Sequence, residues 1–301
     1  MSTRIAIRLA LATTALALAS PSANAELLTG LTTAGNLVRF DSATPGTILT
    51  TVAISGLQAG ETLVGIDFRP ANGALYGVGS TSRLYLVNAT TGAATQVGSS
   101  GAFVLNGTGF GTDFNPVVDR LRVVSNTAQN LRINPNDGAL SAADTALGYG
   151  AGDPNAGATP RVVGSAYTNN FAGANSTTLY ALDANLDVLA IQNPPNNGTL
   201  TTIGALGFNT SDLVGFDISG PSGIAYASLT APGGNASQLF TINLGTGAAT
   251  LVGTIGGVTL SGLAARVGGV PEPASWAMMV AGFGLLGAAI RRRQRALTSA
   301  A

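Results

Sequence analysis

The chain contains no cysteine, no histidine and no lysine, and only 9% of its 301 residues are charged. Without cysteine there is no disulfide, no thiolate nucleophile and no zinc–cysteine site. Without histidine, serine–histidine triads, histidine general bases and the most common transition-metal ligand are excluded. The absence of lysine excludes Schiff-base and serine–lysine chemistry. Few catalytic mechanisms remain, and we expect no cofactor and no transition-metal centre.

The charge balance also excludes a class of partner. All 14 basic residues are arginine, and eight of them lie between residues 26 and 269, together with 13 of the 14 acidic residues. The difference, 8 − 13, gives this segment a net charge of −5. Nucleic-acid binding needs many cations that neutralise phosphates, so the sequence predicts no nucleic-acid partner.

Long apolar runs are confined to the two ends of the chain. At the C-terminal end, 17 uncharged residues from Ala274 to Ile290 precede Arg291, Arg292, Arg293 and Arg295. As a helix this run is about 26 Å long, which is enough to cross a hydrocarbon core. Because the arginines stay in the cytoplasm, they hold everything before Val270 on the far side of the membrane.

The tripartite C-terminal end resembles the PEP-CTERM sorting signal of Gram-negative, exopolysaccharide-producing bacteria. Pro271, Glu272 and Pro273 stand at the motif of that family, followed by the apolar run and the arginines. The resemblance implies recognition by an exosortase, removal of the helix, and release or attachment at the cell surface. The alternative is an ordinary single-pass anchor behind a proline-stiffened stalk, which has the same topology.

The N-terminal end predicts a secretory signal peptide. Arg4 and Arg8 form a basic start, Leu9–Ala19 is a short apolar stretch, and Ala23-Asn24-Ala25 is a small-x-small site for signal peptidase. An N-terminal membrane helix is the alternative. We therefore expect domains at residues 1–25, 26–269 and 270–301, in an exported protein. Its precursor is expected to be anchored in the inner membrane by helix 274–290, before the protein reaches the cell surface or the medium.

The segment between the two signals repeats itself. LYLVNATTGAATQVG at residues 84–98 matches LFTINLGTGAATLVG at residues 239–253. A glycine that opens a short apolar strand recurs with spacings of 46, 53, 51 and 47, at Gly65, Gly111, Gly164, Gly215 and Gly262. An Asn or Asp four or five residues before a Gly also recurs five times, at Asp41–Gly46, Asn88–Gly92, Asn134–Gly138, Asn193–Gly198 and Asn243–Gly247. Such pairs are typical of hairpin turns.

Four short strands in about 50 residues are typical of one blade of a propeller. The first unit has strands near residues 27–31, 37–41 and 47–54 but lacks an inner strand, and residues 262–267 form an inner strand alone. If that last strand completes the first blade, the array closes without an open edge. We therefore predict an all-β fold, a five-bladed β-propeller closed by the C-terminal strand. The alternatives are an open β-solenoid or two stacked sandwiches.

Residues 27 to about 266 also resemble the bacterial domain-of-unknown-function family 4394. The resemblance is carried by three stretches: GIDFRPANGALYGV at 65–78, DRLRVVSNTAQNLRINPNDG at 119–138 and TPRVVGSAYTNN at 159–170. It implies an exported, propeller-like protein and implies no activity.

Three aspartates are the first candidate site. Asp67, Asp113 and Asp217 occupy one repeat position, where the other two units have Ala166 and Ala264. Near a central channel they could hold a hard cation such as Ca²⁺ or form the acid/base pair of a glycosidase. In the alternative, which we favour, each aspartate bonds backbone amides in its own blade, and no metal is bound.

Arg120 and Arg122 lie on one face of a strand and could hold an anionic group such as a uronate or a phosphate. The alternative is an ion-pair ladder with Asp113, Asp119 or Asp137. Tyr149 and Asp153 are the distinctive side chains of a long connection over residues 141–161, and loops of this length on a rigid ring often carry function.

Together these features favour a non-enzymatic, exported propeller that binds an exopolysaccharide, another surface glycan or another surface component. An extracellular carbohydrate-active enzyme that uses the aspartates is the second hypothesis, and a purely structural matrix protein is the third. The enzyme is disfavoured because Glu26 and Glu61 are the only glutamates of the segment and neither lies in a repeated strand.

Overall fold

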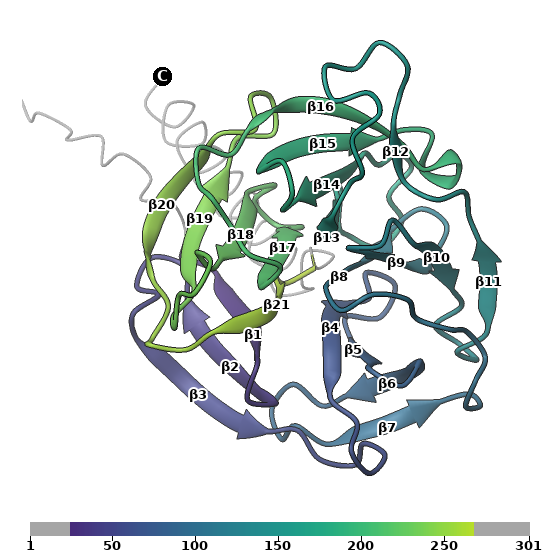
Figure 1. Cartoon of the computed structure of the whole chain (residues 1–301). Coiled ribbons are helices and arrows are strands. Elements are labelled where there is room, and N and C mark those ends of the chain that lie inside the picture. Colours follow the sequence, from purple (N-terminus) through teal and green to yellow (C-terminus); the bar gives the residue numbers. More distant parts are fainter. Residues whose placement is uncertain (1–24, 268–301) are drawn as a thin grey trace, which may run out of the picture.

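Antiparallel hairpins follow one another along the whole of the chain that the computed structural model describes, residues 25–267. They form five sheets arranged around a central axis (Figure 1). In three of them the strands run outwards from the axis in chain order: β4 (Leu63–Phe68), β5 (Leu75–Gly79), β6 (Arg83–Val87) and β7 (Ala94–Val97); β8 (Phe110–Asn115), β9 (Arg120–Ser125), β10 (Asn130–Ile133) and β11 (Leu140–Ala143); β17 (Val214–Ile218), β18 (Ala225–Leu229), β19 (Gln238–Ile242) and β20 (Ala249–Thr254). We number these sheets blades 2, 3 and 5.

Blade 1 is built from both ends of the described chain. Strand β21 (Leu260–Ala264) pairs with β1 (Leu27–Thr32), which is followed by β2 (Asn36–Asp41) and β3 (Ile48–Ala53). In Figure 1 the yellow β21 lies beside the purple β1. The predicted five-bladed propeller and its closure by the C-terminal strand are confirmed. The predicted last strand, residues 262–267, differs from β21: the observed strand begins two residues earlier and ends three residues earlier, because pairing with β1 ends at Ala264.

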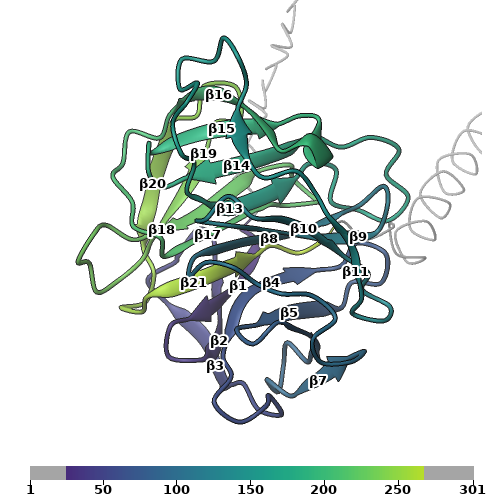
Figure 2. The ribbon, with the colours of Figure 1, turned by 45° about the vertical axis from the view of Figure 1, so that its right-hand side comes forward.

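Blade 4 carries an extra strand. It consists of β13 (Val162–Tyr167), β14 (Leu179–Asp183), β15 (Val188–Gln192) and β16 (Thr199–Ala205), with a short 3-10 turn at Pro195–Asn197. The two residues of β12 (Gly148–Tyr149) add to its outer edge, parallel to β16. The long connection predicted over residues 141–161 is therefore shorter: it begins after β11 and is partly paired to the next blade through β12, which is labelled in Figure 1; Figure 2 gives a second view of the same blades.

The hairpin turns follow the Asn–Gly pattern. The side chain of Asn88 accepts hydrogen bonds from the amides of Thr90 and Thr91 at 2.9 and 3.0 Å, and Gly92 has a φ of +73°. A Cβ on Gly92 would lie 2.9 Å from the carbonyl carbon of Ala53, on the preceding blade. The glycine is thus needed both for the left-handed backbone and for close packing of the turn against its neighbour.

The inner-strand glycines have a different reason. They do not open their strands, as the sequence suggested, but lie at the second or third position. A Cβ on Gly111 would meet the backbone of Gly164 and Ser165 at 2.8 Å, and one on Gly164 would meet the Cβ of Phe216 at 2.9 Å. At these two positions adjacent inner strands approach too closely for a side chain, whereas a Cβ on Gly262 would lie at an ordinary contact distance of 3.5 Å from Ile66 and Leu31.

The hydrophobic core is divided among the interfaces between blades. One cluster joins Val163 and Leu182 of blade 4 to Val214 and Phe216 of blade 5, and the other four clusters join the remaining neighbouring pairs. Because each blade buries its faces against its neighbours, the stability of each blade depends on the closed ring. In residues 25–267, no helix is long and apolar enough to pass through a membrane.

Candidate functional site

The inner strands bring Asp67, Asp113 and Asp217 together at the axis. The three residues lie at equivalent positions of β4, β8 and β17, and one carboxylate oxygen of each lies within 4.8 Å of the others. Their side chains are sealed from solvent, with residue exposures of 2%, 0% and 1%. The separation alone would suit a glycosidase pair, but the burial leaves no approach for a sugar.

Two of the aspartates join neighbouring blades. Asp67 accepts hydrogen bonds from the amide of Phe68 in its own strand and from the amide of Phe114 in blade 3, both at 2.7 Å. Asp217 accepts from Ile218 and, across the closing interface, from Ala265, both at 2.6 Å. The interpretation that we favour from the sequence has each aspartate bonding backbone amides in its own blade. Asp67 and Asp217 do so, and each also accepts a hydrogen bond from an amide of the next blade.

Asp113 differs from the other two aspartates. Neither of its carboxylate oxygens has a hydrogen-bond partner of good geometry among the described residues, although the amide of Tyr167 and the carboxyl of Asp217 adjoin it. Burial, followed by the charges of Asp67 and Asp217, raises the pKa of Asp113 well above its usual value. Burial, followed by the charge of Asp217, does the same to the pKa of Asp67.

The stability of the protein without bound cations should fall as the pH rises. Burial raises the pKa of Asp217 to about 7, although amide bonds from Ala265 and Ile218 oppose the shift. The carboxyl of Asp217 titrates near pH 3.9 in the unfolded state, so between pH 5 and 7 only the folded state keeps the proton. The free energy of unfolding therefore falls as the pH rises through this range towards 7. In buffer with EDTA we expect a loss of about 2 kcal/mol over this range, measured by urea unfolding. A flat or rising profile would contradict it, and Asp217→Asn should show a shallower slope.

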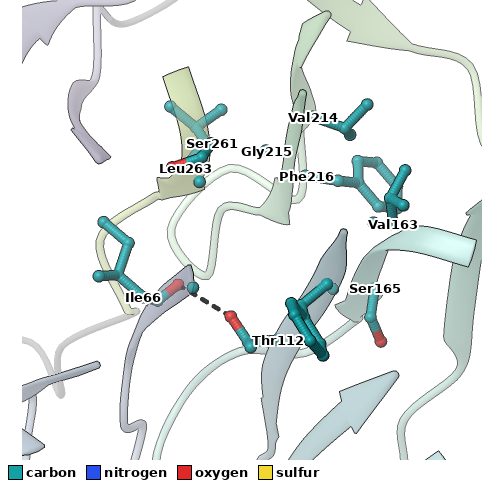
Figure 3. Close-up of a pocket in the computed structure, with 14 residues that line it drawn as sticks. Ile66, Thr112, Val163, Ser165, Val214, Gly215, Phe216, Ser261 and Leu263 are labelled. Carbon is teal, nitrogen blue, oxygen red and sulfur yellow. Dashed lines mark hydrogen bonds between the residues drawn. The ribbon is translucent and has the colours of Figure 1, made fainter. Parts of the chain in front are cut away.

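The channel beside the aspartates is almost closed. A cavity of about 10 Å³ is lined by the inner-strand glycines and by side chains that include Thr112, Ser165 and Phe216 (Figure 3). The hydroxyl of Thr112 donates to the carbonyl of Ile66 at 3.4 Å. A volume of this size accommodates one water molecule at most. The axis therefore offers no passage for an organic ligand.

The structure separates Arg120 from Arg122. Arg122 is 1% exposed and donates to the hydroxyl of Tyr167 at 2.8 Å, to Asp144 at 3.1 Å and to the side chain of Asn196 at 2.8 Å. Asp144, and none of the three aspartates that we expected, is its ionic partner. Arg120 donates to the carbonyls of Val118 and Asp119, while the carboxylate of Asp119 pairs with Arg69. The two arginines thus do not converge on one anion.

Tyr149 and Asp153 hold their own loop against blade 4. The hydroxyl of Tyr149 donates to Asp183 at 2.7 Å. Asp153 accepts from the amide and the hydroxyl of Thr202 at 2.6 and 2.8 Å. Their side-chain bonds therefore anchor the connection. The predicted cleavage site at Ala23 and Ala25 lies at or beyond the edge of the described residues. The sorting residues Pro271, Glu272, Pro273, Arg291, Arg292 and Arg293 and the predicted helix 274–290 lie outside them.

Sequence reasoning missed a cleft of about 460 Å³ between blades 1 and 2, which we call the Arg39–Arg266 cleft. Its walls include Thr29, Arg39, Phe68, Thr90, Arg266 and Val267. Thr29 pairs with Arg39 on one side and with Ala264 on the other, so ring closure brings together arginines from opposite ends of the domain. Neither arginine forms an ion pair within residues 25–267, and the buried Nε of Arg39 has no partner there. No repeat marks either residue in the sequence.

Comparison with known proteins agrees with the two resemblances. Residues 269–293 match the PEP-CTERM protein-sorting motif. No curated protein matches the chain. Similar solved structures include a protein from Lactobacillus plantarum, with 15% identity, a TM-score of 0.41 and coverage of 77% of this chain and 67% of that one. Another is a protein of unknown function from Bacteroides thetaiotaomicron, with 14% identity, a TM-score of 0.46 and coverage of 78% and 62%.

Neither structure adds to the functional argument, because both likenesses have TM-scores below 0.5. The present chain spans 62% of the Bacteroides protein. The family match is much more extensive: the profile of the family described as "Domain of unknown function (DUF4394)" covers residues 36–264, which include every strand of the five blades except β1. The chain therefore belongs to the family of domain of unknown function DUF4394.

Proposed function

We propose that this protein is an exported propeller of the cell envelope or extracellular matrix that binds an anionic surface glycan without chemically changing it. The Arg39–Arg266 cleft is the binding site. The observation that carries the proposal is a pair of arginines with no ionic partner in the described residues, facing a cleft of about 460 Å³ in a domain whose net charge is negative.

The location follows from the sorting motif at residues 269–293, which indicates processing by an exosortase and export to the cell envelope. Surface polysaccharides are abundant ligands there, and acidic sugars offer carboxylates. A guanidinium binds a carboxylate through two parallel hydrogen bonds, which gives both strength and orientation. Thr29 and Thr90 add hydroxyl groups to the cleft, and Phe68 adds an apolar wall.

The absence of turnover is supported by the central aspartates. These are the residues on which the enzyme hypothesis depends, and they are at most 2% exposed, beside a cavity of about 10 Å³. The carboxylate of Glu61 is also engaged in structural contacts. It accepts hydrogen bonds from the hydroxyls of Thr81 and Tyr85, and its Oε2 lies 3.6 Å from Nη1 of Arg83. Burial of the three aspartates and the contacts of Glu61 therefore argue against a role of these carboxylates in hydrolysing a sugar.

Removing both arginines of the cleft should abolish most of the binding. In calorimetric titration of the purified exported protein with polygalacturonate, we expect Arg39→Ala combined with Arg266→Ala to weaken binding about tenfold or more, because each charge-assisted hydrogen bond contributes roughly 1.5–3 kcal/mol. Neutral dextran should bind weakly to all variants.

Arg120→Ala is the matched control, because Arg120 lies in blade 3 and donates to backbone carbonyls, so its loss should leave binding unchanged. Equal binding by the double variant and the native protein would refute the cleft. Release of reducing sugar by the native protein would support the enzyme hypothesis instead. No binding of any polysaccharide would favour a purely structural matrix protein.

A further inference from the structure

Three buried carboxylates lie close together at the axis, and no positively charged side chain among the described residues pairs with them. Asp67, Asp113 and Asp217 are buried, and none of the five ion pairs within residues 25–267 includes them. Buried charges in proteins are paired, coordinated to a metal or neutralised by protons. The site therefore needs a positive partner from outside residues 25–267, and we consider a cation and protons.

The spacing of the carboxylates suits a cation. One oxygen from each lies within 4.8 Å of the others. Ca²⁺ binds oxygen at about 2.3–2.6 Å, so three ligands spaced evenly around the ion lie roughly 4.0–4.5 Å apart, within the observed limit of 4.8 Å. Mg²⁺ gives up its waters reluctantly and usually keeps several of them, for which a sealed site has little room. Three oxygens at the observed spacing can all contact one Ca²⁺ ion on the axis.

Hydrogen bonding leaves the oxygens free to coordinate and fixes their direction. A carboxylate has about four lone-pair positions. Asp67 and Asp217 each use two of them for backbone amides, which hold the side chains in place as outer-shell partners hold metal ligands. Asp113 is 0% exposed, lies within coordinating distance of the other two, and both of its oxygens lack a hydrogen-bond partner within the described chain. A buried carboxylate without a hydrogen-bond partner points to a missing ligand.

We propose that Asp67, Asp113 and Asp217 bind one Ca²⁺ ion on the axis of the propeller, which links blades 2, 3 and 5. Asp113 is the ligand with no other role. Ca²⁺ takes six to eight oxygen ligands, and the three carboxylates supply six when each binds through both of its oxygens. The ion stabilises the closed ring and takes no part in glycan binding, since the cleft is lined by other residues.

The test compares protein refolded with and without calcium. Because the site is sealed, the native protein is unfolded in urea with EDTA and refolded in either 2 mM CaCl₂, 2 mM MgCl₂ or EDTA, concentrations chosen for the roughly millimolar calcium sites of extracellular modules. After desalting, bound metal is measured by mass spectrometry and the midpoint of thermal unfolding by circular dichroism. We expect about one Ca²⁺ per chain, little Mg²⁺, and a midpoint several degrees higher with calcium than with EDTA.

Asp113→Asn is the decisive variant, because the native side chain makes no hydrogen bond whose loss would disturb folding. It should retain less than about a tenth of the calcium and lose the calcium-dependent rise in the midpoint. The control is Asp137→Asn, an exposed turn residue that accepts only from the amide of Ala139, and it should behave as the native protein. Calcium retained by Asp113→Asn would overturn the proposal. The proposal would also be overturned if the native protein refolded without metal and had equal midpoints of thermal unfolding in calcium and in EDTA. That result would mean that protons neutralise the three carboxylates.

Discussion

Replacement of Arg122 by methionine is expected to destabilise the protein by about 3 kcal/mol, because it removes the centre of a buried polar network. The guanidinium donates to Asn130 within blade 3, and to Tyr167 and Asn196 in blade 4. Methionine fills much of the volume, but the buried hydroxyl of Tyr167 loses this donor and the buried Asn130 keeps only the longer bond from Gln192, at 3.3 Å. A buried acceptor that loses a donor carries a desolvation cost. Urea unfolding at pH 7 measures the loss.

Arg132 provides the comparison. It forms two hydrogen bonds with Asp144, at 2.7 and 2.8 Å, but its side chain is 27% exposed. Arg132→Met should cost about 1 kcal/mol, because water replaces part of the lost pair and Arg122 still faces Asp144. Equal effects of the two substitutions would contradict a special role for the buried network. Combining each with Asp144→Asn measures how strongly the partners are coupled.

The importance of Arg122 also follows from the uneven bonding around the axis. Aspartates bond the amide of the next blade between blades 2 and 3 and between blades 5 and 1. Between blades 3 and 4 the equivalent residue, Asp113, lacks a well-directed bond, and Arg122 crosses the same interface further from the axis. Different side chains therefore join different pairs of blades, although the backbone repeats.

The sequence was sufficient to predict the ring because its repeated residues meet repeated constraints. Gly111 and Gly164 recur where neighbouring inner strands nearly touch, and Asn88 and Gly92 recur where a turn must fold tightly against the blade before it. The same alignment placed the three aspartates at one level of the axis. A constraint that acts in every blade produces a periodic pattern in the sequence. This pattern can be detected without knowing which distant residues are in contact.

The arginine interactions could not be predicted for the opposite reason. Arg122 meets Asn196 across 74 positions, and Arg39 and Arg266 meet only because β21 pairs with β1. Each interaction occurs once, so no repeat marks it, and arginine is long enough to reach several acidic neighbours. Local spacing therefore suggested Asp113, Asp119 or Asp137 as partners, whereas the pairing of β9, β10 and β11 within blade 3 brings Asp144 to Arg122.

Substitution of Gly215 by alanine is expected to destabilise the protein by about 3 kcal/mol through the same closing interface. Gly215 lies in β17, and a Cβ there would be 2.6 Å from the carbonyl carbon of Gly262 in β21. The obstacle is backbone, so no side-chain rotation relieves it. The two strands must move apart, which also strains the bond from the amide of Ala265 to Asp217.

Gly148→Ala is the matched control for this closure. Gly148 also lies in a strand, but a Cβ there meets nothing within 4 Å, and its φ is not positive. This variant should unfold within about 0.5 kcal/mol of the native protein. Hydrogen exchange in the Gly215→Ala variant should accelerate first at the amides of β1 and β21, because opening begins where the two ends of the domain meet. Unchanged exchange there, with normal stability, would mean that the ring does not depend on close contact between β17 and β21.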